Sequence, residues 1–174
     1  NNPVVYNNTY YLYKHGARGV LVEPNPNLKQ YIEFVRKEDI LLQKAIDLTS
    51  GKTIKFYEMT GDMVSTTDID TIDNAFLENE AAFELKKVHE VETISFNEIL
   101  DAMTLPPVVI CIDIEGKDYQ VIKSINFSQY HPLIIVAEMQ AWGAKTQQGQ
   151  AIVDYLRTQG YEPSVLSSGL NGIF

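Results

Sequence analysis

The sequence holds a single cysteine among its 174 residues, so no disulfide can form within the chain. This residue, Cys111, lies in the apolar run 108–112, where a buried and unreactive side chain is expected. Long apolar segments are also absent, since the runs 108–112 and 133–137 are far shorter than the roughly 20 residues that span a bilayer. The first residues do not resemble a signal peptide, because they include neither a basic region nor an apolar stretch. We therefore expect a cytoplasmic protein, since a lone cysteine fits a reducing compartment.

Positive charge is scarce as well, with 14 Lys and Arg residues against 23 Asp and Glu residues and a net charge of −9. A chain this acidic lacks the electrostatic footprint that holds a phosphate backbone or an anionic membrane surface. We therefore expect neither nucleic acid nor a membrane as a partner. The length and the hydrophobic fraction of 45% are typical of one globular domain. The oligomeric state stays open.

Histidine is limited to His15, His89 and His131, and no two of them stand at the spacing of metal ligands. Surface or capping roles are favoured for all three, although His89 could reach a pocket. The acidic stretch 68–73 is faintly similar to a calcium loop, but it has Asp73 where the loop needs glycine and Asn79 where it needs glutamate. The sequence therefore predicts no metal site.

Apolar runs alternate with amphipathic segments along the chain, which predicts an α/β fold with a mostly parallel, doubly wound sheet. The region 60–84 is the least regular and the most acidic, and its part 61–67 could form a lid. The expected strands are 19–23, 40–46, 53–57, 90–94, 108–114, 133–138 and 161–166. The expected helices are 10–13, 28–35, 75–82, 96–103, 119–125 and 146–159.

Three expected strands end in a carboxylate, namely Glu23, Asp113 and Glu138. Ligands of open α/β sheets bind outside the carboxyl ends of the strands. An acid after an early strand also suits the hydroxyl groups of a ribose. Any one of these acids alone would be read as a solvated strand end or a helix cap, but together they predict a ligand site.

A glycine-rich phosphate loop is absent, because neither G-x-G-x-x-G nor G-x-x-x-x-G-K-[ST] occurs. The glycines Gly16 and Gly19 precede an expected strand, so they cannot form the turn that follows one. Two alternatives stay open. Either the ligand is not a nucleotide, or the first strand and its turn precede Asn1.

Four segments occur in the order found in FkbM-type methyltransferases, and over nearly its whole length the chain resembles that family. The segments are 19–26 (GVLVEPNP), 44–46 with Ser50-Gly51 downstream, 91–96 (VETISF) and 112–116 (IDIEG). The resemblance implies a Rossmann-like class I methyltransferase fold and S-adenosylmethionine as cofactor. It implies transfer of the methyl group to a hydroxyl oxygen of a carbohydrate or secondary metabolite.

The resemblance also bears on the ends of the chain. The first strand of the family ends in a D-x-G-A-N turn, and Asn1 matches the last residue of that turn. We therefore expect a single domain, residues 1–174, whose first strand precedes Asn1 and whose last strand, at 169–174, is cut short.

The same resemblance implies a set of cofactor-binding residues. Glu23 would hold the ribose, Asn25 would lie beside it, and Asp113 would lie near the methionine moiety. The full set is Asn1, Glu23, Asn25, Ala45, Ile46, Asp47 and Asp113.

On the acceptor side, Glu115 and Trp142 would contact the substrate. Methyl transfer to a hydroxyl gains from alignment of the reacting atoms and from a general base. Asp113 and Glu138 are the candidate bases, by position alone. Two other classes stay open: a non-catalytic binding or assembly module of the same fold, and a different nucleotide-using α/β enzyme such as an NAD-dependent one.

Overall fold

The computed structural model describes residues 2–5, 7–60, 65–69, 84–139, 147–164 and 171–174. Strands and helices alternate through these residues, which confirms the α/β class. The strands are β1 (Val20–Val22), β2 (Ile40–Leu42), β3 (Ala45–Ile46), β4 (Thr53–Met59), β5 (Leu85–Ile94), β6 (Val109–Ile112), β7 (Ile134–Glu138) and β8 (Asn171–Ile173). The helices are α1 (Tyr10–Lys14), the 3-10 turn η1 (Pro26–Leu28), α2 (Lys29–Val35), α4 (Phe96–Ala102), α5 (Asp118–Ser124) and α6 (Gln147–Thr158).

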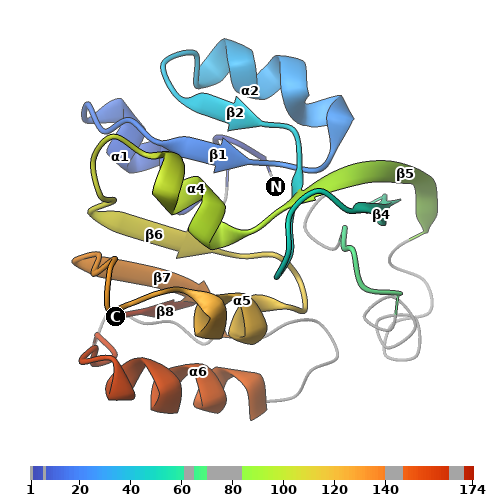
Figure 1. Cartoon of the computed structure of the whole chain (residues 1–174). Coiled ribbons are helices and arrows are strands. Elements are labelled where there is room, and N and C mark those ends of the chain that lie inside the picture. Colours follow the sequence, from blue (N-terminus) through green and yellow to red (C-terminus); the bar gives the residue numbers. More distant parts are fainter. Residues whose placement is uncertain (1, 6, 61–64, 70–83, 140–146, 165–170) are drawn as a thin grey trace.

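In the described residues the strands pair in three small sheets (Figure 1), so the expected doubly wound parallel sheet is not confirmed. The pairs β1/β2, β3/β5 and β6/β7 are parallel, whereas β4/β5 and β7/β8 are antiparallel. A helix lies between the two strands of β1/β2 and of β6/β7, as parallel crossovers require. The antiparallel strands β4 and β8 make the sheets β3-β5-β4 and β6-β7-β8 mixed. The alternation of apolar runs does not distinguish the two strand directions.

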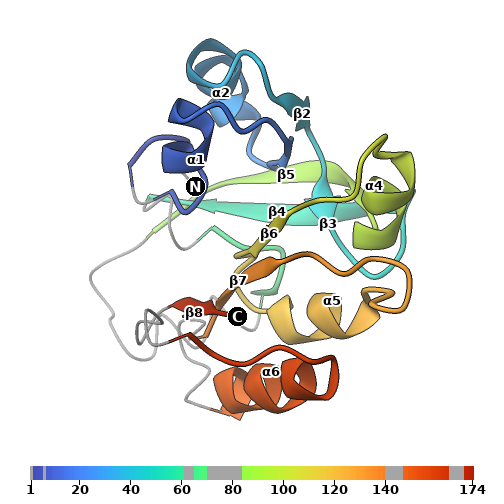
Figure 2. The ribbon, with the colours of Figure 1, turned by 90° about the vertical axis from the view of Figure 1, so that its left-hand side faces the viewer.

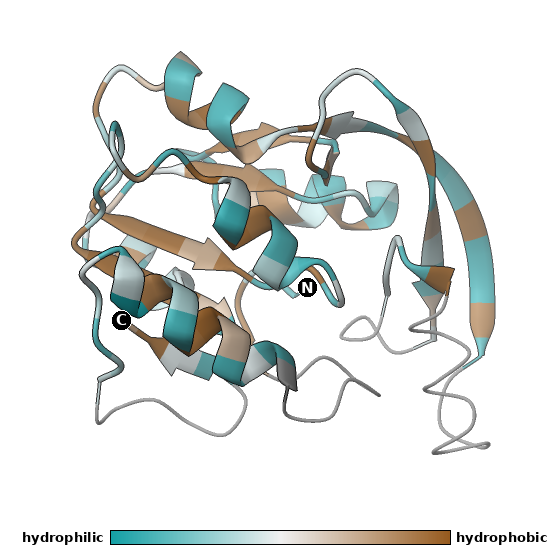
Figure 3. Cartoon of the chain, turned by 60° about the horizontal axis from the view of Figure 1, so that its bottom comes forward, coloured by the Kyte–Doolittle hydropathy of each residue, from teal (hydrophilic) through white to brown (hydrophobic). Residues whose placement is uncertain are grey.

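The helices α4, α5 and α6 lie together on one side of the strands (Figure 2), and α2 packs beside β2. Hydrophobic residues are concentrated on the strands and on the helix sides that face them (Figure 3). The longest of the described helices is α6, with 12 residues, and none of them combines the length and the apolar character needed to cross a bilayer.

The main core lies between β6 and β7 and the two helices α5 and α6. Its most buried members are Ile112, Val121, Ile122, Ile135, Ala137, Ile152 and Leu156. Truncation of such a side chain to alanine typically costs about 2–5 kcal/mol. This core supports β6 and β7 from one side. The nearby Cys111 is partly buried, and burial raises the pKa of its thiol to about 11, so the thiol stays protonated.

The expected strand 40–46 is two strands that belong to different sheets. Between them, the side-chain amide of Gln43 donates to the carbonyl oxygen of Glu23 at 2.5 Å. This contact ties the end of β2 to the end of β1 while the chain passes on to β3, which pairs with β5. The apolar pattern is continuous across the break, so it gives no sign of the change of sheet.

Two other expectations need correction. The strand expected at 90–94 extends over Leu85–Ile94, because its polar half pairs with β4 at the molecular surface. Residues 161–164 form no strand, although the N–H of Ser164 donates to the carbonyl oxygen of Ile173 at 2.6 Å. The helix expected at 75–82 lies outside the described residues.

The parallel strands bring the acidic strand ends to one edge. Ile112 of β6 pairs with Ala137 of β7, so the next residues, Asp113 and Glu138, follow side by side. The strands β1 and β3 end near the same edge, with Glu23 and Ile46. The site is therefore built at the carboxyl ends of strands, as expected for an α/β fold.

Candidate active site

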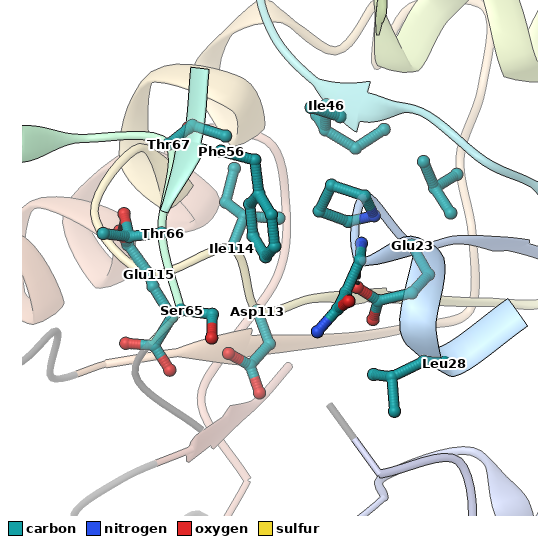
Figure 4. A pocket seen from close by; sticks show the side chains of 14 residues that line it. Glu23, Leu28, Ile46, Phe56, Ser65, Thr66, Thr67, Asp113, Ile114 and Glu115 are labelled. Carbon is teal, nitrogen blue, oxygen red and sulfur yellow. Dashed lines mark hydrogen bonds between the residues drawn. The ribbon is translucent and has the colours of Figure 1, made fainter. Parts of the chain in front are cut away.

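A pocket opens at the carboxyl ends of β1, β3 and β6 (Figure 4). It brings together Glu23 from β1, Ile46 from β3 and Asp113 from the end of β6, three residues that are far apart in the sequence. The lining residues are Val22, Glu23, Pro24, Asn25, Leu28, Ala45, Ile46, Phe56, Ser65, Thr66, Thr67, Asp113, Ile114 and Glu115.

The turn after β1 holds Glu23 at one side of the pocket. The carboxylate Oε1 of Glu23 accepts a hydrogen bond from the N–H of Asn25 at 2.8 Å. Asn25 is buried, and its side chain accepts from the N–H of Asn27 at 3.0 Å, which caps η1. Prolines on both sides of Asn25 restrict the backbone further. Glu23 is thus presented by a rigid turn.

The opposite wall of the pocket is apolar. Ala45 and Phe56 are almost fully buried there, and Ile46 and Ile114 lie beside them. Such a surface suits a flat, weakly polar ring.

Asp47 follows this wall but does not line the pocket. Its Oδ2 accepts from the Nζ of Lys117 at 3.1 Å, and its Oδ1 accepts from the N–H of Leu48 at 2.6 Å. Burial by itself would raise the pKa of Asp47, but these hydrogen bonds hold it below the usual value. The carboxylate fastens the loop after β3 to the loop before α5.

The loop between β6 and α5 places Glu115 at the same edge, and Asp118 holds this loop in shape. Asp118 is fully buried, and its carboxylate accepts from the N–H groups of Ile114 and Gly116 at 3.0 and 3.2 Å. Glu115 has a φ of +56° and Gly116 a φ of +127°, so two consecutive residues take backbone conformations rare for side-chain-bearing residues. The hydroxyl of Thr66 donates to the carbonyl oxygen of Glu115 at 2.8 Å.

Three carboxylates meet beside the pocket. Asp113, Glu115 and Glu138 each place one carboxylate oxygen within 4.8 Å of the others. Glu115 and Glu138 are each only 9% exposed. In the described part of the chain, no hydrogen-bond partner reaches the Oε2 atom of either glutamate.

Burial and like charge shift the acidity of this group. Burial, with the charges of Asp113 and Asp118, raises the pKa of Glu115 well above its usual value. Burial, with the charges of Glu115 and Asp113, raises the pKa of Glu138 further, although the backbone N–H of Glu115 donates to it. Burial also raises the pKa of Asp118. The negative charges of the cluster therefore disfavour one another.

Most of the expected site residues thus lie at one place. Glu23, Asn25, Ala45, Ile46, Asp113 and Glu115 line the pocket, and Glu138 joins it through the carboxylate cluster. Asn1 and Trp142 lie outside the described residues.

Sequence reasoning missed Phe56, Leu28 and the role of Asp118. The alternating pattern of 53–57 is a signal that Phe56 faces inward, but it does not show which pocket Phe56 lines. Residues 65–67 line the pocket, and they include the end of the segment 61–67 that was expected to act as a lid.

A comparison with known protein families identifies the family of this chain. The model of the methyltransferase FkbM domain matches residues 1–163. The chain belongs to the FkbM methyltransferase family. The resemblance found in the sequence is thereby confirmed, and membership indicates methyl transfer as the general activity. No curated protein and no solved structure matches the chain.

In this FkbM domain, three of the four segments that carried the resemblance contribute to the pocket. The fourth, 91–96, lies behind it, where Val91 packs against Ala45 and Phe56. The family signature therefore includes both the ligand-facing edge and its support.

The FkbM domain contains another buried carboxylate, Glu58 on β4, which is 1% exposed. It accepts hydrogen bonds from the Nζ of Lys86 and the Nε2 of His89 at 2.7 Å each, and from the Nδ2 of Asn27 at 2.9 Å. Burial alone would raise the pKa of Glu58, but these donors lower it to about 2. His89, which could have reached the pocket, is instead bound to Glu58.

Proposed function

We propose that this domain transfers a methyl group from S-adenosylmethionine to a hydroxyl oxygen of a carbohydrate or secondary metabolite. The observation that carries the proposal is the shared pocket of Glu23, Asp113 and the apolar wall around Ala45. It combines an acid suited to ribose hydroxyls, a surface suited to adenine and a second acid. We further propose a Rossmann-like class I fold, a cytoplasmic location, and no nucleic acid or membrane partner.

The described residues fit this cofactor. Glu23 would accept hydrogen bonds from the ribose hydroxyls, and its rigid turn avoids an ordering cost on binding. Ala45, Ile46 and Phe56 would contact the adenine ring. When bound, S-adenosylmethionine supplies an electrophilic methyl group.

The protein has two tasks toward the acceptor: to orient it and to take up its proton. Asp113 borders the pocket directly, whereas Glu138 lies behind it in the cluster. We propose Asp113 as the group that accepts the hydroxyl proton, with Glu138 as the alternative. A general base typically contributes about 10²–10⁴-fold to the rate.

Titration calorimetry with S-adenosylmethionine and then with NAD tests the binding part. We expect the first to bind and NAD not to bind. Glu23→Gln should weaken binding of S-adenosylmethionine by roughly 10–100-fold, because charged hydrogen bonds contribute about 1.5–3 kcal/mol. Glu33→Gln is the matched control, since Glu33 forms only an exposed helix pair with Lys29. Binding of NAD alone would overturn the proposal, and binding of neither would favour a non-catalytic module.

Transfer of labelled methyl groups to a panel of hydroxylated sugars and alcohols tests the chemical part. Asp113→Asn should lower turnover by about 10²–10⁴-fold. Full turnover of this variant with unchanged cofactor affinity would exclude Asp113 as the base, and Glu138→Gln then tests the alternative.

A further inference from the structure

The carboxylate cluster has the dimensions of a cation site. Asp113, Glu115 and Glu138 each offer one oxygen, and these oxygens lie within 4.8 Å of one another. Oxygen ligands around one Mg²⁺ or Ca²⁺ ion at ordinary bond lengths lie roughly 3–5 Å apart. The spacing is therefore that of three ligands of a single ion.

Burial makes the cluster unlike a solvated acidic patch. Glu115 and Glu138 are each 9% exposed, and the Oε2 atom of each is buried without a hydrogen-bond partner among the described residues. A buried polar atom without a partner is costly, and such atoms in folded proteins are rare. Two members of one compact carboxylate cluster thus each have a buried oxygen without a partner, which favours a positively charged ligand at the cluster.

The described basic residues do not supply that charge. Lys117, in the same loop as Glu115, pairs with Asp47 at 3.1 Å. Within the described ranges, no lysine, arginine or histidine forms an ion pair with Glu115 or Glu138.

The loop is also held in place independently of any ligand. Asp118 accepts from the N–H groups of Ile114 and Gly116, and Thr66 donates to the carbonyl oxygen of Glu115. These bonds fix the loop in the conformation in which Glu115 faces Asp113 and Glu138. Pre-organised ligands favour binding because little order has to be gained on binding.

We propose that Asp113, Glu115 and Glu138 each use one carboxylate oxygen to bind one divalent cation of the Mg²⁺, Mn²⁺ or Ca²⁺ type. The ligand set contains only carboxylate oxygens. Such ligands are typical of hard cations, whereas sites for the softer Zn²⁺ and Cu²⁺ usually include nitrogen or sulfur ligands. The sequence alone predicted no metal site, because that reasoning looked for histidines at ligand spacing and for a calcium loop, not for acids at the ends of different strands.

The cation also has a place in the reaction, and this part of the inference rests on the proposed function. Asp113 and Glu115 line both the pocket and the cluster, so the cation would face the acceptor side of the pocket. A hydroxyl oxygen bound to a divalent cation loses its proton more readily and is held in one orientation. The acceptor is therefore one whose hydroxyl oxygen can bind the cation.

Mn²⁺ titration followed by electron paramagnetic resonance tests the binding site. The full chain should bind one Mn²⁺, and Mg²⁺ should displace it. Glu115→Gln and Glu138→Gln should each weaken Mn²⁺ binding by at least 10-fold, whereas the exposed Glu98→Gln, on α4, should leave it unchanged. A thermal melt without metal shows that both variants are folded.

Absence of Mn²⁺, Mg²⁺ and Ca²⁺ binding at millimolar concentration would overturn the cation site. Binding unaffected by Glu115→Gln and Glu138→Gln would overturn it as well. Titration of S-adenosylmethionine in the presence of a chelator separates this result from the proposed function. Cofactor binding without any cation binding would leave methyl transfer in place and remove only the cation.

Discussion

Two regions of the molecule contain deeply buried acids: the antiparallel pair β4/β5, with Glu58, and the cluster of Asp113, Glu115 and Glu138. They differ in which groups surround the acids. Glu58 accepts hydrogen bonds from a lysine, a histidine and an asparagine, and its pKa falls to about 2. In the cluster, acids face other acids, and the pKa values of Glu115 and Glu138 rise. A buried charge that its partners compensate is destabilising only when a partner is removed, whereas buried acids without such partners indicate a place for a ligand.

The largest effect on stability is expected at Glu58. A carboxyl with a pKa of about 2 instead of 4.5 contributes on the order of 3 kcal/mol at neutral pH. Glu58→Gln should therefore lower the free energy of unfolding in urea by roughly 2–3 kcal/mol. Glu90→Gln is the control, because Glu90 is exposed on β5, the strand that pairs with β4. Equal midpoints for the two variants would show that the donors around Glu58 do not stabilise it.

The same residue predicts a pH dependence. The pKa of Glu58 is lower in the folded than in the unfolded chain, so the unfolded chain binds the proton first as the pH falls. The contribution of Glu58 is complete above about pH 4.5 and disappears as the pH approaches 2. Urea unfolding at several pH values should show the gap between the unchanged chain and Glu58→Gln narrowing over this interval. A constant gap would contradict the assignment.

A smaller effect of opposite sign is expected in the cluster. Burial and the neighbouring acids raise the pKa of Glu138, so at neutral pH the folded metal-free chain must bind a proton there that the unfolded chain does not hold, which costs stability. Glu138→Gln avoids this cost and should raise the stability of the metal-free chain by roughly 1 kcal/mol or more at neutral pH. The exposed Glu162→Gln should change it much less. Saturating Mg²⁺ should reduce or reverse the advantage of Glu138→Gln, and a destabilised Glu138→Gln would show that the acid is structural, like Glu58.

The edge of the site could be predicted from the sequence because its signal is local. Glu23, Asp113 and Glu138 each end an apolar run, and a strand followed by an acid is visible in a few consecutive residues. The family resemblance added Ala45, Ile46 and Glu115, which line or adjoin the same pocket.

What could not be predicted depends on contacts between distant residues. The contact of Glu58 with His89 requires the antiparallel register of β4 and β5, and the switch of sheets at Gln43 leaves no mark on the apolar pattern. The meeting of Glu115 with Glu138 requires a left-handed backbone at a residue type that rarely adopts one. Spacing along the chain contains none of this information.

Because Glu115 has a left-handed backbone, selection for folding and selection for activity should favour different residues at this position. At a φ of +56° a glutamate is strained by about 1 kcal/mol or more, and glycine or asparagine would relieve that strain. A library randomised at this position and selected only for folding should therefore enrich glycine and asparagine. Selection for activity should keep an acidic side chain. Glycine or asparagine suits the turn best, whereas an acidic residue suits the pocket best. The glutamate at position 115 is therefore expected to reflect selection for activity rather than for stability.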